Sequence, residues 1–226
     1  MVHSDSFHGE GFDLHVRTTS ESFFSYMEAA AIRVGGHVLE VDSNKIYLDG
    51  EEVEAPVAFK STDNKHDYLY TVVETKKNKK FTALEADNRE IVDFRFYKNY
   101  LTLSAKGTET DLYDAQGLLG SFQEGAMIDR DGKAFDRSFE EYAFEWQVNT
   151  LAGDPSLFVT DRSPQLPYER CEMPTQARPA RRLRADTALL KQAESACASA
   201  VGNANDFSLC VDDVMATGEL GLAEVW

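Results

Sequence analysis

Cysteine is scarce in this sequence of 226 residues, and Cys171, Cys197 and Cys210 all lie in its last quarter. An odd number allows one disulfide and a spare thiol, or a bond from one cysteine to a residue outside this chain. No CxxC pair occurs, which argues against a structural zinc site built on cysteine. A chain of this length can bury a hydrophobic core without metal support or many disulfides.

Long apolar runs and positive charge are lacking as well. No apolar stretch approaches the roughly 18 residues that cross a bilayer, so we expect no membrane insertion. Aspartate and glutamate number 39 against 23 lysine and arginine residues, which gives a formal net charge of −16. This charge repels nucleic acid phosphates, so nucleic acid is excluded as a partner. No secretory leader is visible after Met1.

Recognisable catalytic motifs are also absent. No serine or cysteine lies in a nucleophile-elbow context, and no HxH or HExxH spacing indicates a metal site. The stretch "GLLGSF" lacks the Lys-Ser/Thr pair of a phosphate loop. Residues 129–136, "DRDGKAFD", depart from a calcium-binding EF-hand loop and read as an Asp-Gly turn between strands. The five histidines are scattered along the chain: His3, His8, His15, His37 and His66. The sequence therefore predicts a protein that is not an enzyme; a hydrolase built from convergent acids is the least favoured alternative.

Strand patterns fill residues 12–148. In residues 12–18, Phe12, Leu14 and Val16 alternate with polar residues, which is typical of a half-buried strand. Turn signals then mark four hairpins, at residues 35–36, 49–50, 76–80 and 98–99. Residues 142–148, "YAFEWQV", read as a later strand with Trp146 as a core residue. Residues 1–150 are therefore predicted to form a mainly β domain, an antiparallel β-sandwich or meander.

A proline-rich connector is predicted over residues 151–185, because this part of the chain holds five of the six prolines. The connector ends in a basic cluster at residues 178–184, "RPARRLR". This cluster is either a site for proteolytic processing or docking, or simply an exposed linker.

Helical periodicity begins at Asp186 and predicts a small helical hairpin over residues 186–226. Asp186 and Asp206 are the expected N-caps, Gly202 and Gly218 the expected ends, and residues 219–226 a third short helix. Two helices joined by a tight loop would bring Cys197 and Cys210 together, so we expect a disulfide and an oxidising compartment. The alternative is a pair of buried free thiols in a cytosolic protein.

The order of four stretches resembles a divergent, cysteine-poor von Willebrand factor type D domain. They are "GFDLHVRTT" (11–19), "SYMEAAAIRVGGHVLEV" (25–41) with "YLDG" (47–50), "GLLGSF" (117–122) with "RDG" (130–132), and "FEWQV" (144–148) with "SLF" (156–158). Residues 197–218 are similar to the cysteine-bearing helical segment that often follows this domain. The family's opening Gly-Asp-Pro-His motif has no counterpart, which suggests a shortened or truncated first strand.

This resemblance implies an extracellular or cell-surface role in adhesion or structure, with other proteins or the extracellular matrix as partners. A missing first strand would expose a sheet edge through which the protein could associate with itself. In the family, residues 117–120 correspond to a glycine-rich turn: Gly117, Leu118, Leu119 and Gly120. The loop after this turn holds calcium in the family, and the matching positions here are Gln123, Glu124, Asp129 and Asp131. Because this ligand pattern is eroded, we predict no required cofactor. A calcium-dependent ligand- or glycan-binding module is the alternative function.

Overall fold

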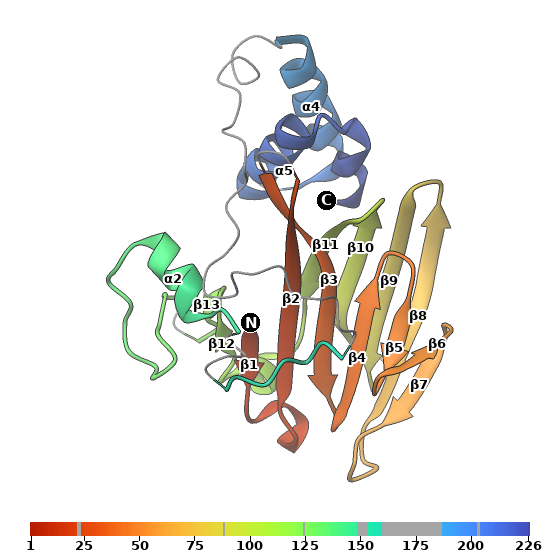
Figure 1. Ribbon diagram of the computed structural model, residues 1–226, viewed down its shortest axis with the longest axis vertical. Coiled ribbons are helices and arrows are strands. Elements are labelled where there is room, and N and C mark those ends of the chain that lie inside the picture. Colours follow the sequence, from red (N-terminus) through yellow and green to blue (C-terminus); the bar gives the residue numbers. More distant parts are fainter. Residues whose placement is uncertain (22–23, 88, 124, 149–152, 160–186, 203) are drawn as a thin grey trace.

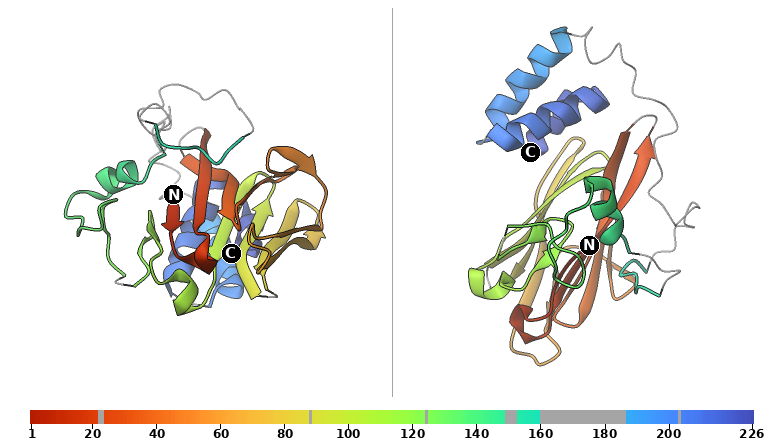
Figure 2. Two further views of the ribbon diagram at one scale, coloured as in Figure 1. Left: turned by 90° about the horizontal axis from the view of Figure 1, so that it is seen from below. Right: turned by 90° about the vertical axis from the view of Figure 1, so that its left-hand side faces the viewer.

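A computed structural model describes residues 1–21, 24–87, 89–123, 125–148, 153–159, 187–202 and 204–226. Two antiparallel sheets face each other, and a helical unit sits over one end of the pair (Figure 1, Figure 2). The predicted mainly β fold with C-terminal helices is therefore confirmed. None of the described helices is long and apolar enough to span a bilayer.

One sheet has eight strands in the order β13-β12-β1-β2-β3-β4-β5-β6, and the other has five in the order β11-β10-β9-β8-β7. The eight strands are β1 (Val2–Ser4), β2 (Phe12–Glu21), β3 (Phe24–Val34), β4 (His37–Asp42), β5 (Ile46–Leu48), β6 (Glu51–Val53), β12 (Gln116–Gly117) and β13 (Gly120–Ser121). The five strands are β7 (Val57–Lys60), β8 (Asp67–Lys76), β9 (Lys79–Ala86), β10 (Arg89–Tyr97) and β11 (Tyr100–Ala105).

The four predicted hairpins form where the local turn signals lie. Gly35 and Gly36 join β3 to β4, and both have positive φ. Asp49 (φ 51°) and Gly50 (φ 86°) join β5 to β6, as expected for a two-residue turn that needs left-handed residues. The other two turns lie between β8 and β9 and between β10 and β11.

The core lies between the two sheets. Apolar residues alternate inward along the strands, and both sheets contribute large, fully buried side chains, among them Phe12, Ile32, Leu39, Tyr68, Tyr70, Leu84, Phe94 and Phe96. The Tyr70 hydroxyl donates to Thr82 Oγ1 at 2.8 Å, so this buried phenol has a partner.

Residues 153–159 cross the outer face of β2, β3 and β4 as a strap (Figure 1). Leu157 N–H donates to His15 Nδ1 at 3.3 Å, and Val159 N–H donates to Glu40 Oε2 at 3.1 Å. The Arg17 guanidinium lies 4.1 Å from the centre of the Phe158 ring. Because of this cover, His15 and Glu40 are buried although they lie on the polar face of their strands.

The prediction of a strand at residues 142–148 is wrong, because residues Phe139–Glu145 form helix α2. Ser138 and Glu141 make a capping box at its start, a signal that outweighs the apparent alternation. Tyr142 and Trp146 are buried, whereas Phe144 is 42% exposed, so the apolar spacing is four residues and not two. The prediction of strands alone from 12 to 148 also missed the short helix α1 (Glu109–Leu112).

Helices α4 (Thr187–Ala200) and α5 (Ala204–Thr217) and the 3-10 helix η3 (Leu220–Val225) form a helical cap. A disulfide joins Cys197 to Cys210, whose Cα atoms are 5.9 Å apart, and both cysteines are buried. Asp206 was expected as an N-cap, but α5 begins two residues earlier and Asp206 lies in its first turn. Asp186, Cys171, most of the connector and the basic cluster at 178–184 lie outside the described residues.

The helical cap docks on the ends of β9, β10 and β11. Tyr97 is buried together with Leu222 and Val225 of η3. Lys98 Nζ pairs with Glu219 Oε1 at 2.6 Å, and Lys79 pairs with Glu224. Apolar and ionic contacts thus connect the cap to the sandwich, and Figure 2 shows the cap over one end of the two sheets.

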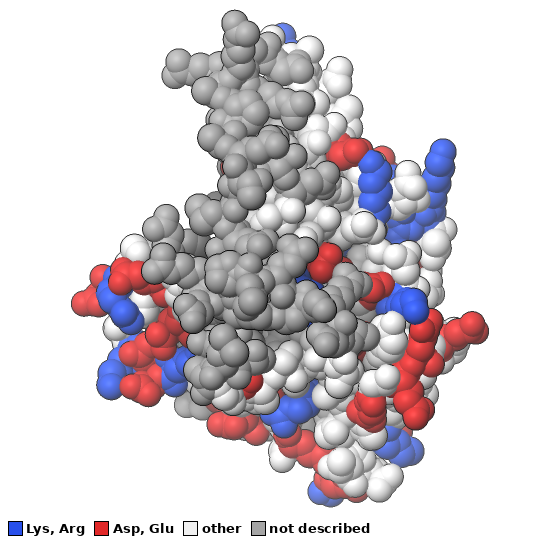
Figure 3. Space-filling model, in the orientation of Figure 1, with Lys and Arg blue, Asp and Glu red and all other residues white. Residues whose placement is uncertain are grey.

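Charged side chains are unevenly spread over the face drawn in Figure 3. Acidic side chains gather near the β5–β6 edge, and basic ones gather at the tip of the β8–β9 hairpin. That tip carries four lysines, at positions 76, 77, 79 and 80.

Candidate functional site

The turn "GLLG" joins β12 to β13. Gly117 pairs with Gly120, and Leu118 and Leu119 form the two-residue turn between them. A Cβ at Gly117 would lie 2.3 Å from the Met1 carbonyl oxygen, and one at Gly120 would lie 2.8 Å from that of Ala126. The buried Tyr142 hydroxyl donates to the Gly117 carbonyl at 2.7 Å. Both glycines are therefore needed where backbone segments approach each other closely.

The residues matched to the family's calcium loop lie just after this turn. Asp129 Oδ1 accepts the N–H groups of Asp131 and Lys133, and Asp131 pairs with the Lys133 ammonium at 3.2 Å. Gln123 donates to the Tyr113 hydroxyl at 3.4 Å. Glu124 lies outside the described residues. Residues 129–133 thus form a turn in which the carboxylates of Asp129 and Asp131 already interact with other groups of the same turn.

A polar hollow of about 280 Å³ lies beside the 117–120 turn. Its lining includes the oxygen-bearing side chains of Asp5, Asp114, Gln116, Ser121 and Gln123, together with His3. Burial raises the pKa of Asp114, but hydrogen bonds from Ser4 and from the N–H groups of Asp5 and Ser6 outweigh it, so the pKa is lowered. Asp114 is consequently a fixed anion at neutral pH.

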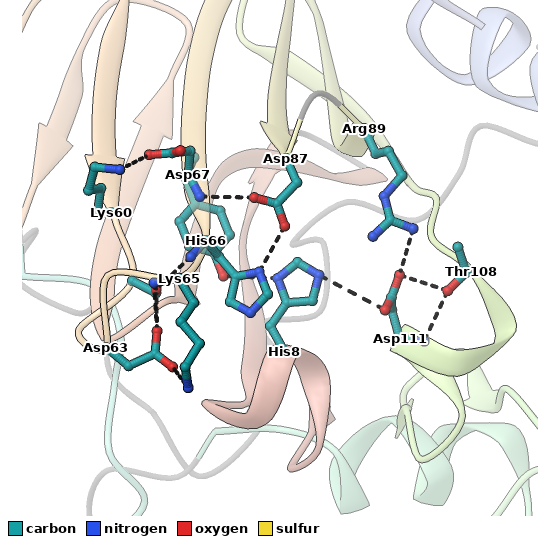
Figure 4. Close-up of polar contacts among 12 residues, drawn as sticks. His8, Lys60, Asp63, Lys65, His66, Asp67, Asp87, Arg89, Thr108 and Asp111 are labelled. Atoms are coloured by element: carbon teal, nitrogen blue, oxygen red, sulfur yellow. Dashed lines mark hydrogen bonds and ion pairs between the residues drawn. The ribbon is translucent and has the colours of Figure 1, made fainter.

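A second cluster lies at the end of the sandwich opposite the helical cap and contains His8, His66 and Asp87 (Figure 4). His8 comes from the short 3-10 helix η1 (Phe7–Gly9), His66 from the turn before β8, and Asp87 from the turn after β9. The two imidazole rings stack with centroids 4.1 Å apart and planes 19° apart. One potential ligand atom from each of the three residues lies within 4.8 Å of the other two.

Hydrogen bonds hold this cluster in place. His66 Nδ1–H donates to Asp87 Oδ2 at 2.8 Å, and Asp67 N–H donates to Asp87 Oδ1 at 3.0 Å. His8 Nδ1 lies 3.2 Å from the Tyr68 hydroxyl, and His8 Nε2 lies 3.9 Å from Asp111 Oδ1. The hydrogen bond from His66 is the main cause that lowers the pKa of Asp87. Burial, followed by the charge of His66, lowers the pKa of His8.

Asp111 belongs to a polar wall next to His8. Thr108 Oγ1 donates to Asp111 Oδ2 at 2.7 Å, and Arg89 pairs with the same oxygen at 3.4 Å. His8, Arg89, Lys106, Thr108 and Asp111 line part of a cavity of about 280 Å³. The His8 ring thus forms part of the wall of this cavity.

Sequence reasoning did not find this cluster, since its members are 58 and 79 residues from His8 in the chain. No local spacing could have signalled it. The only feature of the sequence that pointed to the cluster is that all three residues can bind a metal and lie next to turns. Among the described residues, only His8, His66 and Asp87 bring three His, Cys, Asp or Glu side chains so close together.

No protein-family model and no curated protein matches this sequence. The resemblance to the von Willebrand factor type D domain therefore stays a prediction that depends on the residues quoted for it.

Proposed function

We propose that this protein is a non-catalytic structural or adhesion module of the von Willebrand factor type D kind that works outside the cell or at its surface. The observation that carries the proposal is the disulfide between Cys197 and Cys210 in a helical cap docked on a β-sandwich. Disulfides persist in oxidising compartments and are rare in reducing ones. A sandwich stabilised in this way is suited to a durable spacer or docking unit.

The free part of β8 supports an interaction role. β7 pairs only with Asp67–Tyr70, so the remainder of β8 forms the outer edge of the five-stranded sheet among the described residues. Val73 there is 68% exposed. An exposed edge can add a strand from another chain, so we include self-association through β8 in the proposal. The edge first expected beside β1 is covered, because β1 pairs with both β2 and β12.

The proposal is tested with protein alkylated during extraction from its natural source, followed by mass spectrometry without reduction. We expect Cys197 and Cys210 to be found joined. Binding to immobilised extracellular-matrix proteins and sedimentation velocity then test the interaction role. Two alkylated thiols, or a protein that stays monomeric and binds no matrix protein, would contradict the proposal.

The alternative function, calcium-dependent binding of a ligand or glycan, is favoured by the polar hollow beside residues 117–120. Its side-chain oxygens are the hard ligands that Ca²⁺ prefers. A calcium titration followed by melting temperature tests it, because a ligand that binds only the folded form stabilises it. D5N should weaken the shift, whereas E54Q, at an exposed position away from the hollow, should leave it unchanged. No shift at millimolar calcium excludes this alternative.

A further inference from the structure

We propose that His8, His66 and Asp87 form a binding site for a divalent transition-metal ion, with Zn²⁺ as the expected occupant. The site does not overlap the loop that resembles the family's calcium site. It brings two imidazoles and a carboxylate from three distant parts of the chain to one point (Figure 4).

The ligand types select the class of metal. Imidazole nitrogen suits Zn²⁺, Cu²⁺ and Ni²⁺, whereas Ca²⁺ and Mg²⁺ prefer oxygen ligands. Two histidines with one carboxylate are a common zinc-binding set. Ca²⁺ is therefore not expected to bind here.

The carboxylates around the histidine pair favour a positive ion. Asp87 holds His66, and Asp111 lies 3.9 Å from His8 Nε2 on the other side of the pair. His66 Nδ1 and Asp87 Oδ2 already lie 2.8 Å apart, so an ion bound to both atoms would take the place of the proton that they share. The stacked imidazoles thus lie between two carboxylates, and because Asp111 is already paired with Arg89 at 3.4 Å, Asp87 is the carboxylate offered to a cation.

The backbone positions these side chains at a cost. His8 (φ 49°) and Asp87 (φ 49°) both have left-handed backbone conformations, which residues other than glycine rarely adopt. Residues at ordinary turns of this protein, such as Asp49 and Lys98, have the same conformation, so it places the two side chains without itself indicating a site. Moreover, the His8 side chain is only 6% exposed, so the imidazole is held in a largely dry place.

Binding requires only a small movement. Donor atoms around one Zn²⁺ lie about 3.4 Å apart, since each bond is about 2.1 Å long. The three atoms here lie within 4.8 Å of one another, and near-parallel rings must turn to direct their nitrogens at a shared ion. Rotation of the side chains about their own bonds supplies this movement, and His66 is 25% exposed and has room to turn.

The consequence is a link between the two sheets. His8 follows β1 of the eight-stranded sheet, whereas His66 and Asp87 flank strands β8 and β9 of the five-stranded sheet. An ion bound to all three would hold the sheets together at the end of the sandwich opposite the disulfide-bonded cap.

The test uses the whole chain, stripped of metal with a chelator and titrated with Zn²⁺ in competition with a chromophoric chelator. Wild type should bind one Zn²⁺ per chain. Co²⁺ should bind in its place and show absorption bands in the visible range, as expected for cobalt in a low-symmetry site with imidazole ligands. H66A and D87N should each weaken Zn²⁺ binding at least tenfold. The matched control is H37A. His37 also pairs with an aspartate, since its Nδ1 lies 2.7 Å from Asp49 Oδ2, but it lies outside the cluster of His8, His66 and Asp87.

Thermal unfolding provides a second readout that does not depend on the chelator. Zn²⁺ at about one hundred times its wild-type dissociation constant should raise the melting temperature by about 5 °C in wild type and H37A, and by no more than about 3 °C in H66A. Far-UV circular dichroism checks that each variant is folded. Equal Zn²⁺ affinity in wild type and H66A, or no Zn²⁺ binding by folded wild type, overturns the proposal. Neither result bears on the adhesion role, which the proposal does not use.

Discussion

At the scale of single residues, His15 shows how a polar side chain can fasten a covering segment. It lies on β2, is 5% exposed, and accepts the N–H of Leu157. Burial is the main cause that lowers its pKa from 6.5 to about 4. Only neutral imidazole can accept this hydrogen bond at Nδ1. The strap at residues 153–159 therefore depends on His15 remaining unprotonated.

Acidification should weaken the protein through His15. Because the pKa is lower in the folded state, the contribution of neutral His15 is complete above pH 6.5 and is lost as pH falls toward 4. The loss near pH 4.5 is about 2–3 kcal/mol. Urea unfolding at neutral and acidic pH measures it in wild type and in H15Q, whose amide accepts the bond without titrating. The same pH dependence in both proteins would show that His15 does not carry the effect.

Two glycines with positive φ allow a second test at this scale. An added Cβ at Gly117 would meet the Met1 and Val2 backbone, whereas one at Gly125 would meet no atom within 4 Å. We expect Gly125→Ala to cost about 1 kcal/mol from backbone strain alone. Gly117→Ala should cost at least about 3 kcal/mol, because the hairpin must separate from β1. Chemical unfolding of the two variants measures both losses in the free energy of unfolding. Equal losses would contradict the close approach of the Met1 and Val2 backbone to Gly117.

At the scale of elements, hairpins were predictable and packed segments were not. Asp49-Gly50 and Gly35-Gly36 carry their turn signal within two residues, so the sequence alone located them. Helix α2 was missed because Tyr142, Phe144 and Trp146 fit alternation as well as helical spacing, and because the capping box of Ser138 and Glu141, which marks the helix start, was overlooked. The stack of His8 on His66 depends on contacts between distant turns, which no local pattern encodes.

The disulfide between Cys197 and Cys210 should contribute most to the stability of the helical cap itself. Cys197 and Cys210 close a loop with a sequence separation of 13, a size for which a disulfide contributes about 3 kcal/mol. Reduction, or the double change of both cysteines to serine, should destabilise α4 and α5 by about this amount while the sandwich stays folded. Hydrogen exchange resolved by segment measures this difference. Equal exchange in α4 and α5 before and after reduction would contradict it.

At the scale of the whole molecule, one hydrophobic cluster lies between the two sheets, and another joins the cap to the sandwich. Tyr97 belongs to β10, yet it is buried against the cap. A Cβ at Gly221 would lie 2.6 Å from the Tyr97 ring, so the chain runs very close to the sheet there. Lys98 and Lys79 add ion pairs at the rim of this interface.

A net charge of −16 should make the stability of the molecule depend on salt. The Debye length is about 30 Å at ~10 mM salt and about 8 Å at ~150 mM, so repulsion among acidic side chains is strong only in dilute salt. We expect the melting temperature to rise by about 2–4 °C between these conditions, in the presence of a chelator. NaCl and KCl should act equally, because screening depends on ionic strength. A fall in melting temperature would instead show that ion pairs such as Arg130 with Asp154 outweigh the repulsion.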